Sequence, residues 1–413
     1  MRPAGRRDAA DSRHEQVGSP DAEAARFRTI LHEALGAPFV DGHSVEPLRN
    51  GVEIFPAMLD AIDEAATSIE FETFVYWSGE IAHRMADALA RAADRGVEVR
   101  VLLDAAGCLP MPDDVRETLG RADVRVREFG SLQSWRFWEL DHRTHRKILV
   151  CDGRVGFTGG VGVAEEWEGD ARNPDEWRET HFRIRGPAVS SLRGVFLEHW
   201  LASRNGGKEP ARLLPSCEGD DRDLGAPRGT AAIQTVASTA AGRWSTTQTL
   251  VRALVCAARR SVRITTGYFV PEDEVVSLMR DAVDRGVEVD VIHPGPHIDH
   301  RVSRLAGEAR YPELLEAGVR IWRYQPTMIH AKIVLVDDIL SCIGSANLNH
   351  RSAVKDDEVA LLVLDRALNA ELSRDFERDK EGCELVASDA DWLHRPWWKR
   401  MAAKAASLVS REV

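Results

Sequence analysis

One polar pattern, H-x-K-x4-D, occurs twice in this chain of 413 residues. The first copy consists of His145, Lys147 and Asp152, and the second of His330, Lys332 and Asp337. Every position of the second copy follows its counterpart by 185 residues, and the same spacing separates Gly159-Gly160 from Gly344-Ser345. An internal duplication that carries a polar cluster predicts an active site assembled from two related halves.

The residue types in this pattern indicate the chemistry that such a site could perform. The chain has only seven lysines among its 54 Lys and Arg residues, yet two of the seven belong to the pattern. A lysine is a compact point charge, so two lysines in one pocket would trap an anion, and phosphate is the obvious candidate. One imidazole could act as a nucleophile while the other protonates the leaving oxygen and later deprotonates an acceptor. The lysines would neutralise the phosphoryl oxygens, so we expect no metal and no other cofactor. Either copy alone could be a solvated surface pair, but two copies in register argue against that interpretation.

Length and composition favour a two-domain globular protein without membrane spans. Hydrophobic residues make up 44% and charged residues 29% of the chain, which is typical of a soluble protein. The net charge of −12 disfavours nucleic acid as a partner. The six cysteines show no C-x-x-C or zinc-like spacing and no apolar run approaches the length of a bilayer span, so we expect a reduced, cytoplasmic location.

The elements that must position the two motifs follow the same order in each half. In the first half we expect a helix over 55–66, a strand over 68–77, a helix over 80–94 and a strand over 97–104. The second half repeats this order with a strand over 261–270, a helix over 273–285 and a strand over 287–293. Each motif is expected on a further strand, 145–152 and 330–337, with His and Lys alternating onto one face.

This order predicts an α/β fold with a mixed sheet in each half. The expected organisation is a disordered tail over 1–24, an N-terminal half over 25–203, a linker over 204–232 and a C-terminal half over 233–413. The tail contains basic residues but no apolar core, so it is not expected to be a signal peptide.

The segments around both motifs resemble the phospholipase D superfamily and, within it, the cardiolipin synthase-like members. The resemblance covers roughly residues 45–400 and rests on HRKILVCDGRVGFTGG, EWRETHFRIRGPAV, YPELLEAGVRIWRYQPTMIHAKIVLVDD and IGSANLNHRS. It implies two pseudo-symmetric α-β-α sandwich halves with the active site at their interface. It also implies a covalent phosphohistidine intermediate, formed without a metal.

The resemblance assigns further residues to this site. It implies that Glu179 and Glu358 orient the two catalytic histidines, and that Asp152 and Asp337 are structural. The residues that it implies for phosphate binding are Lys147, Lys332, Gly160, Ser345 and Asn347. Gly162 departs from the family pattern, because the family commonly has Asn at this position. The family more often uses the N-terminal histidine as nucleophile, so we expect His145 in that role and His330 as the general acid.

Three functions remain open at this point. The leading interpretation is a phosphatidyltransferase of the cardiolipin synthase type, which moves a phosphatidyl group from phosphatidylglycerol to an alcohol. The alternatives are a phospholipase D-type hydrolase that acts on lipid, or less readily nucleic acid, and a non-catalytic lipid-binding relic. The intact His and Lys residues argue against the relic, whereas transferase and hydrolase differ only in how water reaches the pocket.

A phospholipid substrate requires contact with a membrane, which we expect to be peripheral and at the inner face of the cell membrane. Two tryptophan-containing segments are candidates for this contact, SLQSWRFWEL (131–140) and the basic, amphipathic PWWKRMAAKAASLV (396–409). These tryptophans could equally pack inside the protein. The oligomeric state does not follow from the sequence, which is compatible with a monomer.

Overall fold

The computed structural model describes residues 20–121, 123–130, 142–203, 226–239 and 245–386. The first half contains α1 (Pro20–Leu35), β1 (Val40–Arg49), α2 (Asn50–Glu64), β2 (Ser68–Thr73), α3 (Glu80–Asp94), β3 (Glu98–Asp104), α4 (Asp113–Arg121), β4 (Arg125–Phe129), β5 (Arg143–Thr144), β6 (Ile148–Cys151), β7 (Val155–Gly159), the 3-10 helix η2 (Glu165–Trp167), β8 (Thr180–Arg185) and α5 (Ala188–Ala202). The second half contains β9 (Ala231–Ser238), α6 (Thr246–Ala257), β10 (Ser261–Thr265), α7 (Asp273–Asp284), β11 (Glu288–Pro294), α8 (Arg301–Glu308), α9 (Tyr311–Glu316), β12 (Arg320–Tyr324), β13 (Ile333–Val336), β14 (Leu340–Gly344), α10 (His350–Val354), β15 (Asp356–Leu364), α11 (Arg366–Glu381) and β16 (Cys383–Leu385). None of these helices has the length and apolar character that crossing a membrane would require.

The duplication is visible in matched helices. In α3 the buried residues recur at helical spacing from Ile81 to Ala92. In α7 the buried residues recur in the same way from Val275 to Ala282. A glycine with positive φ, Gly96 in one half and Gly286 in the other, follows each helix and turns the chain into the next strand. The same local pattern therefore builds the same strand–helix–strand unit twice.

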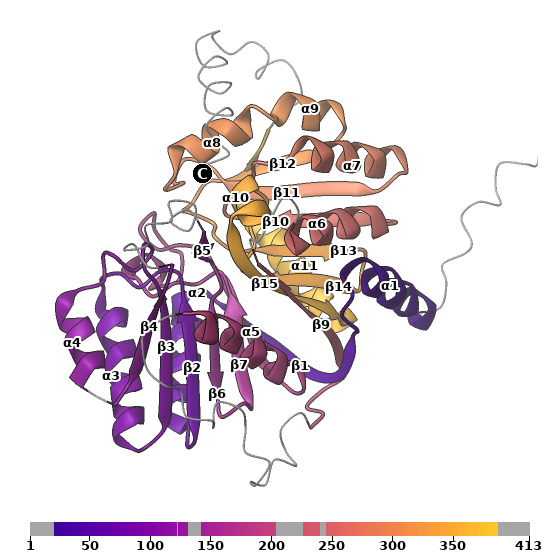
Figure 1. Ribbon diagram of the computed structural model, residues 1–413. Coiled ribbons are helices and arrows are strands. Elements are labelled where there is room, and N and C mark those ends of the chain that lie inside the picture. Colours follow the sequence, from indigo (N-terminus) through magenta and orange to yellow (C-terminus); the bar gives the residue numbers. More distant parts are fainter. Residues whose placement is uncertain (1–19, 122, 131–141, 204–225, 240–244, 387–413) are drawn as a thin grey trace, which may run out of the picture.

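The strands of the two halves have the same spatial order. The first half runs β8-β7-β6-β2-β3-β4 and the second runs β15-β14-β13-β10-β11-β12, with parallel and antiparallel pairs in each. Strands β1 and β9 pair with each other between β8 and β15, so the two mixed sheets join into one continuous sheet. Figure 1 shows this arrangement, with the first half in indigo and magenta and the second in orange and yellow. The expected α/β class with two related halves is confirmed.

Helices cover both faces of this sheet. One core lies between the first sheet and α2 and α3, and another lies between the second sheet and α6, α7 and α9. A third core contains residues of both halves, with α5 and α11 packed on it. The halves therefore share buried apolar surface, which holds them in a fixed relative position.

The strands expected over 68–77 and 261–270 end earlier, at Thr73 and Thr265, and the two motif strands begin later than expected. Strands β6 and β13 begin at Ile148 and Ile333, so the His and Lys of each motif precede the strand instead of lying on it. The reason is that the backbone of each histidine pairs with the opposite half, as described below.

The predicted domain boundaries also differ from the observed elements. Helix α1 begins at Pro20, inside the stretch expected to be a tail, and β9 begins at Ala231, inside the expected linker. Helix α1 belongs to the first half in sequence but packs on α6 of the second half, because Phe27 and Leu31 are buried in that core. Residues 1–19 and 204–225 lie outside the described residues.

Candidate active site

The aspartate of each motif organises the turn behind its strand. Asp152 accepts hydrogen bonds from the backbone N–H groups of residues 66–68, and Asp337 accepts them from residues 259–261. Both aspartates have a positive φ, +54° and +53°. Each carboxylate therefore ties the end of its motif strand to the start of β2 or β10, away from the cavity described below. This geometry is what a structural role requires.

Each motif histidine is held by the opposite half of the protein. The backbone N–H of His145 donates to the carbonyl of Asp357 at 2.9 Å, and that of His330 donates to the carbonyl of Arg178 at 2.8 Å. The next residue in each case is a glutamate that contacts the imidazole. His145 Nδ1 lies 3.0 Å from Glu358 Oε1, and His330 Nδ1 lies 2.8 Å from Glu179 Oε2. The two crossed pairs are related by the duplication, and all four side chains are buried.

The two motif lysines lie beside their histidines. The ammonium group of Lys147 donates to the backbone oxygen of His145 at 2.8 Å. The ammonium group of Lys332 donates to the backbone oxygen of His330 and lies 2.9 Å and 3.0 Å from its ring nitrogens. Both side chains are almost completely buried. Each half therefore presents one imidazole and one ammonium group at the junction of the halves.

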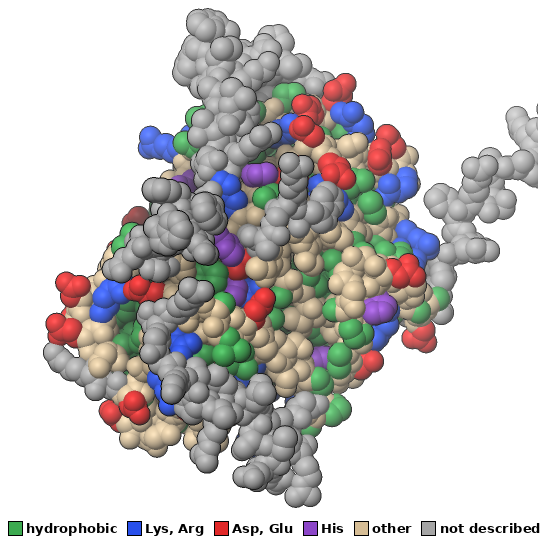
Figure 2. All heavy atoms as spheres, in the orientation of Figure 1, with side chains coloured by type: hydrophobic (Ala, Val, Ile, Leu, Met, Phe, Trp, Pro, Cys, Tyr) green, Lys and Arg blue, Asp and Glu red, His purple; other side chains and the backbone are tan. Residues whose placement is uncertain are grey.

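A cavity of about 330 Å³ opens at this junction. His145, Lys147, His330 and Asn347 line it, while Lys332 lies behind the His330 ring. Among the described residues of the first half, the rest of the lining is apolar or aromatic, namely Phe74, Val75, Trp77, Trp167 and Trp177. Among those of the second half, the lining apart from Tyr268 is polar and includes Asp299, His300, Ser303, Asn349, Arg351 and Asp356. Figure 2 shows histidine side chains at the surface between the two halves.

Aromatic rings pack against both imidazoles. Phe74 meets the His145 ring edge-on with centroids 5.3 Å apart, and the ammonium group of Lys147 lies 5.3 Å from the same Phe74 ring. Trp167 and Trp177 each lie 5.3 Å from the His330 ring. These contacts restrict ring rotation and exclude water from one side of each histidine.

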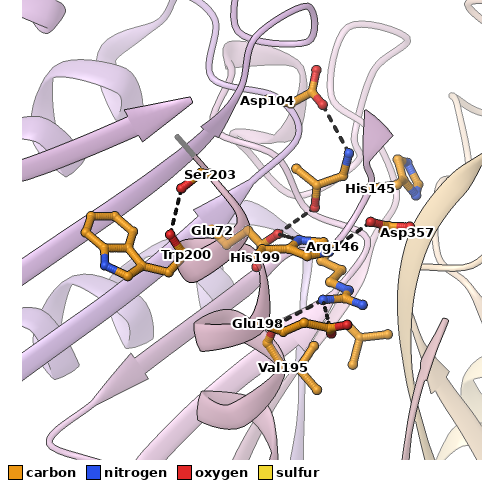
Figure 3. A network of polar contacts seen from close by, with 12 residues as sticks. Glu72, Asp104, His145, Arg146, Val195, Glu198, His199, Trp200, Ser203 and Asp357 are labelled. Atoms are coloured by element: carbon orange, nitrogen blue, oxygen red, sulfur yellow. Dashed lines mark hydrogen bonds and ion pairs between the residues drawn. The ribbon is translucent and has the colours of Figure 1, made fainter. Parts of the chain in front are cut away.

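A buried polar network anchors the segment that carries His145 (Figure 3). Strand β5 pairs with Asp356 and Asp357 of β15, which joins the two halves next to the site. His199 lies between Glu72 at 2.6 Å and Asp357 at 2.9 Å. Thr144, the residue before His145, donates its hydroxyl to Glu72 at 2.5 Å. Burial lowers the pKa of His199, but the two carboxylates outweigh this effect and raise it, which favours the charged form that bridges them.

Burial determines the charge states at the centre of the site. It lowers the pKa of both motif histidines to about 4, assisted by the neighbouring lysines and opposed by the paired glutamates. It also lowers the pKa of Lys147 to about 7 and that of Lys332 to about 8. Burial would raise the pKa of Glu179, but Lys332 and His330 lower it to about 2. In the free protein near neutral pH both imidazoles are therefore uncharged, with Nδ1–H donating to a glutamate. Nε2 of His145 is then available to a ligand, whereas Nε2 of His330 lies 3.0 Å from the Lys332 ammonium group.

The two halves differ at the position after the motif glycine. Ser345 donates its hydroxyl to Glu358, whereas its counterpart Gly160 lies against Glu179. A Cβ atom at Gly160 would lie 2.3 Å from Glu179 Oε2, so any other residue there must displace this carboxylate. Neither Gly160 nor Ser345 lines the cavity, and both lie beside the carboxylates.

The family departure at Gly162 has a steric counterpart in the structure. A Cβ atom there would lie 2.8 Å from Val75 and 3.1 Å from Trp167. The equivalent Asn347 has room beside His330, because Gly267 has no side chain to fill that space. The first half therefore presents an aromatic surface where the second presents an amide.

Sequence reasoning did not identify the aromatic wall, Asp299, Ser303 or the His199 network. These residues lie outside the motifs and reach the site only through the fold. The EWRETH segment that carries Glu179 also supplies Trp177, which is the one local signal for the wall. The proposed membrane segments 131–140 and 396–409 lie outside the described residues.

Comparison with known proteins identifies relatives of both halves. A family model described as "Cardiolipin synthase, PLD-like domain" matches residues 58–189 and 251–380, one match in each half. Cardiolipin synthase A of Pseudomonas putida is 34% identical over 402 residues, which cover 96% of this chain and 80% of that protein. Cardiolipin synthase 1 of Bacillus cereus is 32% identical over 363 residues, which cover 85% of this chain and 69% of the relative.

Solved structures share the fold at low sequence identity. Phosphatidylserine synthase of Haemophilus influenzae superposes with a TM-score of 0.71 at 16% identity and covers 94% of this chain and all of that one. Polyphosphate kinase of Porphyromonas gingivalis superposes with a TM-score of 0.54 at 15% identity, covering 89% of this chain and 53% of the other. Both are similar to this chain in fold.

Proposed function

This chain belongs to the cardiolipin synthase family of phospholipase D-like proteins, and on that basis we propose that it is a phosphatidyltransferase that acts on phospholipid. It moves the phosphatidyl group of one phosphatidylglycerol molecule to an alcohol, and a second phosphatidylglycerol as acceptor yields cardiolipin and glycerol. The observation that supports this function best is the pair of crossed His–Glu contacts at one cavity that two lysines adjoin. Family membership and two related histidines with different surroundings favour a two-step transfer.

In the first step, Nε2 of His145 attacks the phosphorus atom of the donor. A phosphorus–nitrogen bond forms and the bond to the glycerol headgroup breaks. His330, which takes up a proton when the anionic donor binds, gives this proton from Nε2 to the departing oxygen. Glu358 holds His145 in the tautomer whose Nε2 lone pair faces the cavity. Lys147 stabilises the charge on the phosphoryl oxygens, and the Asn347 amide lines the same cavity. Lys332, beside the His330 ring, adds its positive charge to the field at the phosphate.

In the second step, His330 takes a proton from the acceptor hydroxyl, whose oxygen attacks the phosphohistidine. The new phosphodiester leaves, His145 is regenerated, and His330 is again protonated for the next donor. Glu179 supports the positive charge that His330 acquires. The anionic phosphate of the bound donor opposes the effect of the lysines and raises the pKa of His330 toward the value that this role needs.

The assignment of His145 as nucleophile can be tested directly. Phosphatidylglycerol with a radiolabelled phosphorus is mixed with enzyme, the reaction is quenched with base, and the labelled peptide is mapped. Label on His145, lost in His145→Gln and retained in His330→Gln, supports the assignment. Label on His330 would reverse the two roles.

The reaction itself is tested with purified full-length protein and vesicles of phosphatidylglycerol. The products are identified by mass spectrometry, with His145→Gln as the inactive control. Cardiolipin and free glycerol in equal amounts support the transferase. Phosphatidic acid as the main product at every lipid concentration would identify a hydrolase instead, and absence of both products would overturn the enzymatic proposal.

We further propose that the protein reaches its substrate by peripheral contact with an anionic membrane surface. Basic residues near such a surface contribute about 1 kcal/mol each, so binding should weaken as salt increases. The expected contact segment, 396–409, is tested by removing residues 396–413 and measuring vesicle sedimentation. Unchanged binding of a folded, truncated protein would place the contact elsewhere.

A further inference from the structure

The lining of the cavity is divided between the two halves of the protein. The wall from the first half is aromatic and adjoins both histidines, His145 through Phe74 and His330 through Trp167 and Trp177. The wall from the second half is polar apart from Tyr268, which adjoins His330. From this division we infer that the polar wall is a subsite for a polyhydroxyl headgroup, anchored by Asp299 and Ser303. The inference rests on the proposed transferase function and assigns the acceptor to a particular side of the cavity.

Ser303 provides the first argument. Its side chain is buried, with 3% of the residue exposed, and it lines the cavity. Its hydroxyl has no hydrogen-bond partner among the described residues. Leaving a buried hydroxyl unpaired costs about 1–3 kcal/mol, so the position favours a ligand that supplies the partner.

Asp299 provides the second argument. It lies just before α8, four residues ahead of Ser303, and both residues line the cavity. The Tyr268 hydroxyl donates to the carboxylate of Asp299 at 2.7 Å and 2.8 Å, which holds that carboxylate at the rim of the cavity. The oxygens of a carboxylate can each accept more than one hydrogen bond, so Asp299 retains acceptor sites for hydroxyl groups of a ligand.

The position of Tyr268 connects this subsite to the chemistry. Its ring meets the His330 ring edge-on with centroids 6.2 Å apart. In the proposed mechanism His330 serves the leaving alcohol in the first step and the acceptor alcohol in the second, so both alcohols occupy the same place. A polyol subsite beside His330 therefore agrees with the assignment of His145 as the nucleophile. The diacylglycerol part of the donor would then lie toward Phe74, which packs against His145.

The pairing of a hydroxyl with a carboxylate on this wall favours a polyol over an ammonium headgroup. An ammonium group only donates hydrogen bonds, whereas glycerol hydroxyls can both donate to Asp299 and accept from the Ser303 hydroxyl. Among the described residues, Arg351 is the one arginine of the lining, and its ion pair with Asp356 at 3.1 Å reduces its attraction for a second anion. The aromatic rings near Asp299 could accept a cation, so ethanolamine is included as a competing acceptor below.

The experiment separates donor chemistry from acceptor choice. The donor is the p-nitrophenyl ester of phosphatidic acid in mixed micelles, because its leaving group carries no hydroxyls that could use the subsite. Release of p-nitrophenol reports the first step. The partition of the phosphatidyl-enzyme between water, glycerol, 1-propanol and ethanolamine then reports the second step, with each acceptor supplied over a range of concentrations.

For the wild-type protein we expect glycerol to be preferred to 1-propanol and to ethanolamine. Asp299→Asn and Ser303→Ala should each reduce the glycerol-to-propanol ratio at least about 5-fold, as one lost hydrogen bond would. Asp281→Asn on the exposed face of α7 is the matched control and should leave this ratio unchanged.

The possible results are distinguishable. Unchanged ratios in both variants, with normal p-nitrophenol release, would overturn the subsite while leaving the transferase intact. A wild-type preference for ethanolamine that Asp299→Asn abolishes would replace the polyol by an ammonium ligand. Failure of the wild-type protein to release p-nitrophenol or to form a phosphohistidine would refute the proposed function itself.

Discussion

The close contact between Gly160 and Glu179 allows a sharp test of how the site is positioned. Replacing Gly160 by alanine would put a Cβ atom 2.3 Å from Glu179 Oε2. To restore an ordinary contact of 3.4 Å, the carboxylate must move by about 1.1 Å. The Glu179–His330 distance is 2.8 Å, so such a shift can stretch this hydrogen bond beyond its normal range.

The expected consequence is a loss of catalysis without loss of the fold. A misplacement of about 1 Å at a reacting group can cost about 100-fold in rate. We therefore expect Gly160→Ala to lower kcat for cardiolipin formation by roughly 100-fold and to change KM much less, because the cavity lining is untouched. No left-handed backbone strain contributes, since Gly160 does not have a positive φ.

The assay is the initial rate of cardiolipin formation from phosphatidylglycerol vesicles, with thermal unfolding measured in parallel. Gly194→Ala is the matched control, because a Cβ atom there meets nothing within 4 Å and alanine favours helix α5. Adding Glu179→Asp to Gly160→Ala shortens the carboxylate side chain and should recover part of the lost rate. A Gly160→Ala protein with normal kcat would refute the steric argument.

Three other predictions concern the same site. Lys147→Arg and Lys332→Arg should each lower kcat/KM by about 100-fold or more in the vesicle assay. The reason is that a guanidinium is wider than an ammonium group and displaces the phosphoryl group. Near-normal turnover in both variants would show that positive charge alone suffices. The pH profile of kcat/KM should fall on the alkaline side between about 7 and 8, where the two buried lysines lose their protons as pH rises through their lowered pKa values. It should fall on the acid side near 4, where His145 becomes protonated and loses its nucleophilic lone pair; constant activity up to pH 10 would contradict this. Asp337→Ala should lower the free energy of unfolding by about 2–3 kcal/mol, measured with denaturant, because three backbone N–H groups lose a charged acceptor.

Much of the local structure could be predicted from the sequence. Helix α3 was expected over 80–94 and spans Glu80–Asp94, because its apolar residues recur at helical spacing and Gly96 ends it. The strands that follow α3 and α7 were also expected to within a residue or two. Periodicity and glycine placement are short-range signals, so they survive in the sequence whatever the rest of the chain does.

The motif itself was also a local signal. A His and a Lys two residues apart must lie close together in any extended segment, and their repetition after 185 residues required two related halves. The sequence therefore predicted the residues of the site and the kind of anion that they could bind. The prediction that these His and Lys residues lie on a strand was wrong. The backbone of each histidine is hydrogen-bonded to the opposite half of the protein, and the local sequence does not reveal that partner.

Contacts between distant residues came only from the fold. The imidazole of His145 pairs with a glutamate 213 residues away and that of His330 with one 151 residues away. The spacing of residues along the chain does not relate such distant positions. It also does not show that α1 packs on the second half, or that one cavity wall is aromatic and the other polar. Those features arise because burial of apolar surface brings the two duplicated halves together along β1 and β9, and that junction decides which side chains face one another.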